Sequence, residues 1–396
     1  MKSRVSLIDC ADYDLDRVRE ALRECLAPLG GMEAFVRPGQ RALLQVNLIS
    51  PRPPEDAVCT HPSVVRAVCQ LVREAGGTPA VGGSGGAAGL AYHRTRKILE
   101  VSGIAAAAAA EGAEVVNYDE VEGQAVANDD SPEHSMSLAR PVKETDVLIT
   151  LPKMKTHNLT LFTGAVKNHV GTLPGRRKLA LHKHFADPRT FGAAVLDLYA
   201  SAPPRLAIMD AVEGMEGDGP TAGRVRQVGL LAASADGVAL DAVMCAVAGL
   251  DLEQVPTLTA ARERGYGAAA LDDVEVVGVP LATARGRLAP FAYPGSYRVS
   301  AQSWLPSWGW RFVTKVMSMA PTPQVMTEKC TGCQVCIKGC PAQTISLVNR
   351  KAHIDLSNCI SCFCCHELCP SQAVEVKIPW HLRAFGGKEA AALAGR

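Results

Sequence analysis

The stretches CTGCQVCIKGCP at residues 330–341 and CISCFCCHELCP at residues 359–370 decide the fold of the C-terminal part of this chain. Each has four cysteines spaced C-x-x-C-x-x-C-x-x-x-C and closed by proline, the pattern of bacterial [4Fe–4S] ligation, in which the fourth cysteine of a run ligates the other cluster. One predicted cluster is held by Cys330, Cys333, Cys336 and Cys369, and the other by Cys359, Cys362, Cys365 and Cys340.

Zinc is the competing metal, because C-x-x-C pairs also form tetrahedral zinc sites. Eight cysteines in two proline-closed runs favour iron–sulfur clusters over zinc. Cys364 falls outside the pattern, and we interpret it as a packed or surface thiol, with cluster ligation as the alternative. The five cysteines before residue 330 are scattered on apolar stretches, which is typical of core filler.

The region of the two runs resembles the bacterial two-cluster ferredoxins over about 40 residues. The resemblance implies a small α+β ferredoxin-like domain, at residues 324–378, that transfers one electron at a time at low potential. Nothing in the sequence specifies a flavin or another organic cofactor, although a flavin would couple one-electron clusters to two-electron chemistry.

The rest of the chain predicts a second, larger folding unit, because 396 residues exceed the roughly 250–300 at which one hydrophobic core stops growing. Apolar strand-like runs, such as Ala42–Val46 and Val147–Leu151, alternate with helical patterns. This alternation predicts an α/β domain around a mostly parallel sheet at residues 1–280. Residues 281–323, which hold three of the four tryptophans, are predicted to be a connector, and residues 379–396 a tail.

Composition and charge limit the partners and the location. The formal net charge is only +1, which argues against a surface built for nucleic acid. No stretch has the roughly 20 apolar residues of a membrane span, and the first residues lack the pattern of a secretory signal. We therefore expect a cytoplasmic protein that has no membrane span and binds no nucleic acid.

Polar residues follow several predicted strands, and ligands of open α/β sheets bind at that edge. Asn47 follows the second strand, a glycine-rich turn containing Gly83, Ser84 and Gly85 follows the third, and Asp210 follows a later one. The glycine turn is either a ligand-free turn or a cradle whose backbone N–H groups bind phosphate. These four residues, Asn47, Gly83, Ser84 and Gly85, are the candidates for binding a cofactor.

Residues 153–184 are the most informative stretch, since they contain seven lysines and arginines, four histidines and no acidic residue. This local charge predicts a site for a carboxylate or phosphate anion. The candidate catalytic residues are Lys153, Lys155 and Lys167, which would hold the anion, and His157, which would transfer a proton. For His157, His169, His182 and His184, proton transfer, metal ligation and a structural role all remain open.

The motifs QVNL at 45–48, THP at 60–62, PKMKTH at 152–157 and GAVKN at 164–168 resemble those of the domain-of-unknown-function family 362, over roughly residues 40–280. Members of this family often carry ferredoxin modules, but the resemblance implies no particular reaction.

Two functions follow as hypotheses. In the first, the chain is an oxidoreductase whose clusters pass electrons to an anionic substrate or cofactor in the α/β domain. In the second, it is an electron-transfer or accessory subunit whose α/β domain recognises a redox partner protein. Hydrolysis is disfavoured, because the sequence holds no nucleophile elbow with an assignable base.

Overall fold

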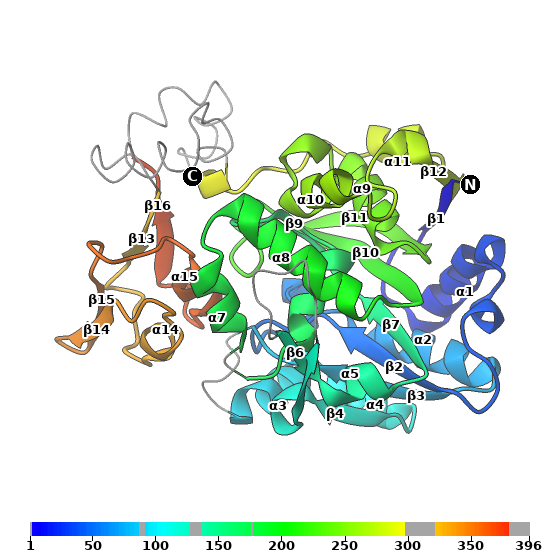
Figure 1. Cartoon of the computed structure of the whole chain (residues 1–396), viewed down its shortest axis with the longest axis horizontal. Coiled ribbons are helices and arrows are strands. Elements are labelled where there is room, and N and C mark those ends of the chain that lie inside the picture. The colour runs from blue at the N-terminus through cyan, green and yellow to red at the C-terminus, as the bar shows by residue number, and fades with distance from the viewer. Residues whose placement is uncertain (1, 87–91, 127–135, 176, 298–320, 380–396) are drawn as a thin grey trace.

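The computed structural model describes residues 2–86, 92–126, 136–175, 177–297 and 321–379. Most of the predicted tryptophan-containing connector and the predicted tail, at 298–320 and 380–396, lie outside these residues. Figure 1 shows a large α/β domain with a small module, coloured orange to red, at one end.

Ten strands form the main sheet in the described part of the chain. They are β1 (Ser3–Asp9), β2 (Arg41–Val46), β3 (Thr78–Gly83), β4 (Glu114–Asn117), β7 (Val147–Leu151), β8 (Lys153–His157), β9 (Leu161–Thr163), β10 (Leu206–Glu216), β11 (Arg224–Ser234) and β12 (Val274–Gly278). The order is β12-β1-β11-β10-β7-β2-β3-β4, with β8 and β9 branching from β10. A separate hairpin joins β5 (Gly123–Val126) to β6 (Met136–Ala139).

The predicted α/β class with a mostly parallel sheet is confirmed. Strands β10, β7, β2, β3 and β4 are all parallel, and β12 runs parallel to β1. Only β11 breaks the pattern within the main path, pairing antiparallel with both β10 and β1. Residues 217–223 between β10 and β11 are too few for the crossover of a dozen or more residues that a parallel pair needs.

Helices cover both faces of the sheet. One face packs α1 (Leu15–Leu26), α2 (Pro62–Glu74), α3 (Tyr92–Val101) and α4 (Ile104–Ala110), and the other packs α6 (Ala165–Asn168), α8 (Pro188–Ser201), α9 (Gly237–Val247) and α10 (Pro256–Arg264). The large domain also contains α5 (Arg140–Glu144), α7 (Arg177–His184) and α11 (Leu281–Gly286). Successive strand residues such as Leu43 and Leu44 belong to opposite hydrophobic clusters, as the two-residue period of a strand requires.

The small module has two similar halves, each containing one cysteine run. Its elements are β13 (Thr322–Val325), α14 (Val335–Lys338), β14 (Ile345–Val348), β15 (Lys351–Ile354), α15 (Cys364–Leu368) and β16 (Val374–Lys377). β13 pairs with β16 and β14 with β15, both antiparallel. Gln334 and Phe363, at corresponding places in the two runs, both precede a helix in the left-handed conformation.

The loop between β10 and β11, in the α/β domain, forms hydrogen bonds with the module. The Thr221 hydroxyl donates a hydrogen bond to the Glu367 carbonyl (3.1 Å), and the Gln372 amide donates to the Thr221 carbonyl (3.3 Å). Helix α15 therefore faces the large domain, while β14 and β15 lie on the opposite side of the module (Figure 1). Within the described residues, every helix is too short or too polar to span a bilayer.

Candidate cluster sites and a buried cationic centre

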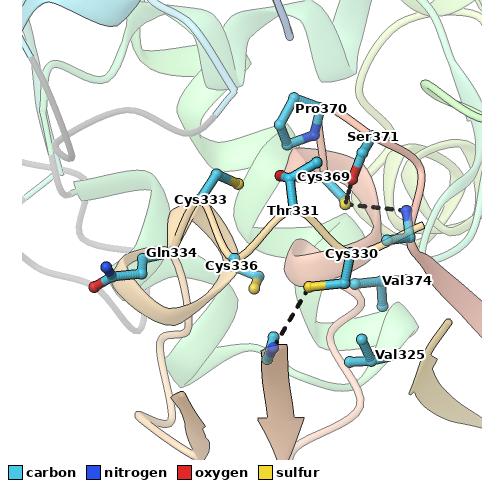
Figure 2. A pocket seen from close by; sticks show the side chains of 13 residues that line it. Val325, Cys330, Thr331, Cys333, Gln334, Cys336, Cys369, Pro370, Ser371 and Val374 are labelled. Atoms are coloured by element: carbon cyan, nitrogen blue, oxygen red, sulfur yellow. Dashed lines mark hydrogen bonds between the residues drawn. The ribbon is translucent and has the colours of Figure 1, made fainter. Parts of the chain in front are cut away.

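Two cavities in the module are each lined by four cysteines. The first is lined by Cys330, Cys333, Cys336 and Cys369 (Figure 2). The second is lined by Cys340, Cys359, Cys362 and Cys365. Each cavity takes three cysteines from one run and one from the other, so the structure brings together the two sets that the sequence assigns to separate clusters.

Backbone N–H groups point at the sulfur atoms that line these cavities. Ala373 donates to Cys369 Sγ (3.1 Å), Thr344 to Cys340 Sγ (3.4 Å) and Ala352 to Cys330 Sγ (3.5 Å). A cysteine must lose its proton to ligate a metal, and such donors stabilise the resulting thiolate. They also tune the reduction potential of a bound cluster.

The donor set fits a [4Fe–4S] cluster in each cavity. A [4Fe–4S] cluster of this kind is ligated by three cysteines of a CxxCxxC run and one distant cysteine, and each cavity contains that set. When bound, the cluster supplies one-electron transfer. Burial raises the pKa of the free Cys336 thiol to about 11, so binding an iron cluster there would displace a proton. Across the described ranges, no three His, Cys, Asp or Glu side chains are placed to hold a single metal ion.

Cys364, the cysteine outside the pattern, is only 3% exposed. It packs in a small apolar cluster with Cys362 and Leu368, against the half-buried Val335. In the first run the corresponding place is occupied by Val335 itself, which agrees with the interpretation of Cys364 as a packed thiol.

Lys153 is held in a buried ion pair inside the α/β domain. Its ammonium lies 3.0 Å from Asp210 Oδ2 and donates to the Tyr13 hydroxyl (2.5 Å), which in turn donates to Asp210 Oδ1 (2.8 Å). The side chains of Lys153 and Asp210 are both fully buried. Tyr13 also stacks on the His61 ring, with 3.5 Å between centroids. Lys153 therefore binds other groups of this protein in the structure.

Lys155 lies nearby and is also fully buried. Its ammonium donates to Asn47 Oδ1 (2.7 Å) and to the Val58 carbonyl (2.6 Å). Burial, together with the charges of Lys153 and Lys167, lowers the pKa of Lys155 to about 7. Asn47 also donates to Asn168 Oδ1 (3.1 Å), so two of the predicted residues, Asn47 and Lys155, meet at this sheet edge.

The glycine turn after β3 packs closely against its own domain. A Cβ on Gly83 would lie 2.9 Å from a Leu48 methyl group, and one on Gly85 2.5 Å from Ile98. The Ser84 hydroxyl donates to Asp119 (2.6 Å) and accepts from the buried Lys178 ammonium (2.6 Å). Close packing thus accounts for the glycines, and whether the turn also binds phosphate stays a prediction.

His157 reaches the module. Its Nδ1 accepts hydrogen bonds from the backbone N–H groups of Leu159 (2.9 Å) and Thr160 (3.3 Å), so the proton of the neutral ring lies on Nε2. That Nε2 is 3.2 Å from Glu367 Oε1 on α15, and neither atom has a hydrogen-bond partner in the described part of the chain. Burial lowers the pKa of His157 to about 4, which keeps the ring neutral near pH 7.

Lys167 is the half-buried cation of the predicted catalytic set. Loss of hydration lowers its pKa, while the charges of Glu367 and Cys364 oppose that shift. Among the described residues, no hydrogen bond or ion pair engages its ammonium, unlike those of Lys153 and Lys155. The charge of Glu367, on the module, therefore acts on a lysine that no other described residue engages.

Two of the remaining predicted histidines pack against aromatic rings. His169 Nε2 lies 2.9 Å from the Ala202 carbonyl, and its ring meets Tyr199 edge-on. The His182 ring packs on Phe191 at 4.6 Å. Burial lowers the pKa of both histidines to about 4, so both are neutral at pH 7, as expected for structural residues.

The sequence pattern missed Glu367 and Lys178. Glu367 lies between the ligand candidates Cys365 and Cys369, and a carboxylate so close to a cluster motif was a usable signal. Lys178 belongs to the basic stretch, but its contact with the glycine turn depends on a tertiary approach of α7 to the end of β3.

Comparisons with known proteins agree with this architecture. A family model described as domain of unknown function (DUF362) matches residues 43–246, and one described as a 4Fe-4S dicluster domain matches residues 322–370. A thylakoid-associated protein of Synechocystis sp. is 36% identical over 273 residues, which is 69% of this chain and 83% of the relative.

Two solved structures give weaker matches. The lactate racemase apoprotein of Thermoanaerobacterium thermosaccharolyticum has a TM-score of 0.39 at 12% identity, covering 61% of this chain and 58% of that one. A protein from Thermotoga maritima has a TM-score of 0.32 at 12% identity, covering 58% and 57%. The chain thus spans less than two thirds of either protein.

Proposed function

Because the chain belongs to the DUF362 family and carries a C-terminal 4Fe-4S dicluster domain, we propose that it is an iron–sulfur oxidoreductase with two [4Fe–4S] clusters. In this proposal the clusters pass electrons to an anionic substrate or cofactor held in the α/β domain. The observation that carries it is the pair of cavities, each lined by four cysteines drawn from both runs. Two complete ligand sets support two clusters rather than one.

The basic sheet edge supports the second half of the proposal. Among the described residues the Lys167 ammonium has no hydrogen-bond or ion-pair partner. Lys155 has a pKa of about 7, which suits a group that exchanges protons near neutral pH. Lys153 serves this edge as a structural cation, because its charge is matched by Asp210. An anion bound to Lys167 would be close to the module, because Glu367 and Cys364 act electrostatically on that lysine.

The test is retention of an anion by the holoprotein. Protein purified without oxygen is examined by native mass spectrometry, and any released small molecule is identified. The proposal predicts a bound anion that is lost in Lys167→Met and kept in the exposed control Lys97→Met. Absence of a retained anion from the cluster-loaded wild type would overturn the substrate-binding half of the proposal.

A second function, an electron-transfer or accessory subunit, is favoured by a different observation. Lys153, Lys155 and Lys178 are all engaged by groups of the protein itself. The module also exposes Leu347, Val348 and Leu356, each 43–49% accessible, beside or on the β14–β15 hairpin. Two results together would support this function instead. The protein would form a stable complex with a redox protein that is lost in Leu347→Lys, and its α/β domain would retain no small molecule.

A cytoplasmic location is also part of the proposal. The relative from Synechocystis is described as thylakoid-associated, so attachment to a membrane surface is the alternative. Fractionation of lysed cells decides between them, since a cytoplasmic protein stays in the supernatant at low salt.

A further inference from the structure

We propose that the β14–β15 hairpin of the module is the docking surface for an acidic electron-carrier protein, which passes electrons to the cluster site of the first cavity. This inference rests on the two clusters of the proposed function. It adds the kind of protein partner and the place where electrons cross the protein surface, and it holds whether or not the α/β domain binds an anion.

The tip of the hairpin packs directly on the first cysteine run. The Ala352 N–H donates to Cys330 Sγ (3.5 Å; Figure 2), and the Lys351 ammonium donates to the Cys330 carbonyl (2.6 Å). A Cβ on Gly332 would lie 2.4 Å from the Arg350 carbonyl oxygen, so the turn of the hairpin also touches this run. A protein bound on the tip would therefore lie beside the ligands of the first cluster.

The hairpin exposes apolar side chains on the side of the module that faces away from the α/β domain (Figure 1). Leu347 and Val348 are 43% and 49% exposed, and Leu356, just after β15, is 49% exposed. These are three of the five large apolar side chains that are exposed in the described part of the chain. Within that part β14 pairs only with β15, so its other edge is open. Neighbouring exposed apolar groups at an open strand edge are typical of a protein–protein contact.

Charge indicates the kind of partner. Residues 345–358, which are the hairpin and the turn after it, carry Arg350, Lys351 and His353 but only one carboxylate, Asp355. A second copy of this chain would place these basic residues against one another, which is unfavourable. An acidic protein with carboxylates around its redox group complements the hairpin and would be steered toward it.

The exposure of the cysteines favours the first cluster as the electron acceptor. Cys333, next to the Gly332 on which the hairpin turn packs, is exposed, whereas Cys362 and Cys365 of the second set are buried. A cluster ligand at the surface beside the hairpin also favours a redox protein over a lipid surface as the occupant.

The experiment uses the full cluster-loaded chain and a flavodoxin, an acidic carrier whose flavin absorbance differs from that of the clusters. Calorimetry measures the binding of oxidised flavodoxin, and stopped-flow absorbance measures electron transfer from its hydroquinone. Each transfer oxidises the hydroquinone anion to the neutral semiquinone and reduces one cluster by one electron, so no proton moves. Both measurements are made at about 0.01 M ionic strength, where charges act over roughly 30 Å.

Arg350→Glu is expected to slow electron transfer about tenfold, because it reverses a charge that steers the carrier. This effect should vanish near 1 M salt, where charges act over only about 3 Å. Leu347→Ser is expected to weaken binding severalfold at either salt concentration. The matched control is Lys377→Glu, which reverses an exposed charge on β16, in the other two-stranded sheet of the module, and should have a much smaller effect.

Equal binding and equal rates in Arg350→Glu and Lys377→Glu would overturn the inference. So would a dimer, detected by light scattering, that Leu347→Ser dissociates, because a second copy would then occupy the hairpin. Binding to phosphatidylcholine–phosphatidylglycerol vesicles without binding to flavodoxin would replace the carrier with a membrane surface. Iron content is measured on each preparation: zinc in place of iron overturns the proposed function, while flavodoxin binding to that protein still tests the docking surface.

Discussion

Lys153→Met should destabilise the α/β domain strongly, because it leaves Asp210 as a buried and uncompensated charge. The ammonium and the carboxylate lie 3.0 Å apart and both side chains are fully buried. Breaking such a pair by removing one partner costs about 3–5 kcal/mol. Asp210 keeps the Tyr13 hydroxyl and the His61 N–H as donors, which places the expected loss toward the lower end of that range.

The assay is urea unfolding followed by far-ultraviolet circular dichroism. With a denaturant slope of about 3 kcal/mol/M, a loss of about 3–5 kcal/mol lowers the midpoint by about 1 to 1.7 M. The double variant Lys153→Met/Asp210→Leu should recover much of the stability, since an apolar pair of similar volume can replace a buried ion pair.

The matched control is Lys97→Met, which removes an exposed pair with Glu100 at 3.1 Å and should leave the midpoint unchanged. If Lys153→Met unfolds at the same urea concentration as the control, the buried pair does not stabilise the fold as argued. A double variant less stable than Lys153→Met alone would refute the charge argument specifically.

Three further predictions follow from burial and packing. Burial lowers the pKa values of Lys155 and Lys178 to about 7, so the unfolded chain binds more protons than the folded one between pH 7 and the usual lysine pKa. The free energy of unfolding should therefore rise from pH 7 to 9, by up to roughly 1.4 kcal/mol per pH unit for each lysine. Urea midpoints measured at each pH should show this rise, and a smaller one in Lys155→Met. A flat wild-type profile would contradict those shifts. Gly192→Ala places a Cβ 2.5 Å from Pro256 and should cost about 1–3 kcal/mol in thermal or urea unfolding, whereas Gly286→Ala, with nothing within 4 Å, should be neutral; equal effects would refute the packing argument. Iron content should fall in Cys336→Ser but not in Cys364→Ser, and a matching loss in the latter would make Cys364 a ligand.

The fold was largely predictable because its signals are local. Apolar runs such as Val147–Leu151 became buried strands, and the short glycine-containing segment 217–223 accounts for the antiparallel pairing of β10 with β11. The segment Lys153–His157, which comes just after the predicted strand Val147–Leu151, is itself the strand β8 beside β10. Its pairing depends on the β10 extension beyond Met209, which the local apolar pattern does not reveal.

The site was predictable in its parts but not in its pairings. The basic stretch contains many cations, but the sequence does not show which of them form ion pairs or hydrogen bonds inside the protein. The partners of Lys153, for example, are Tyr13 and Asp210, which lie far away in the sequence. The same holds for His157, whose partner Glu367 lies in another domain. Residue types and spacing carry the chemistry of each group, and only tertiary packing decides which groups face one another.

The measurement that tests the account most directly is the metal content of the protein purified without oxygen, with EPR of its dithionite-reduced form. Two [4Fe–4S] clusters predict about eight iron and eight sulfide per chain, and an EPR spectrum of two interacting reduced clusters. Zinc in place of iron, or about four iron with one cavity unfilled after reconstitution, would contradict the two-cluster account.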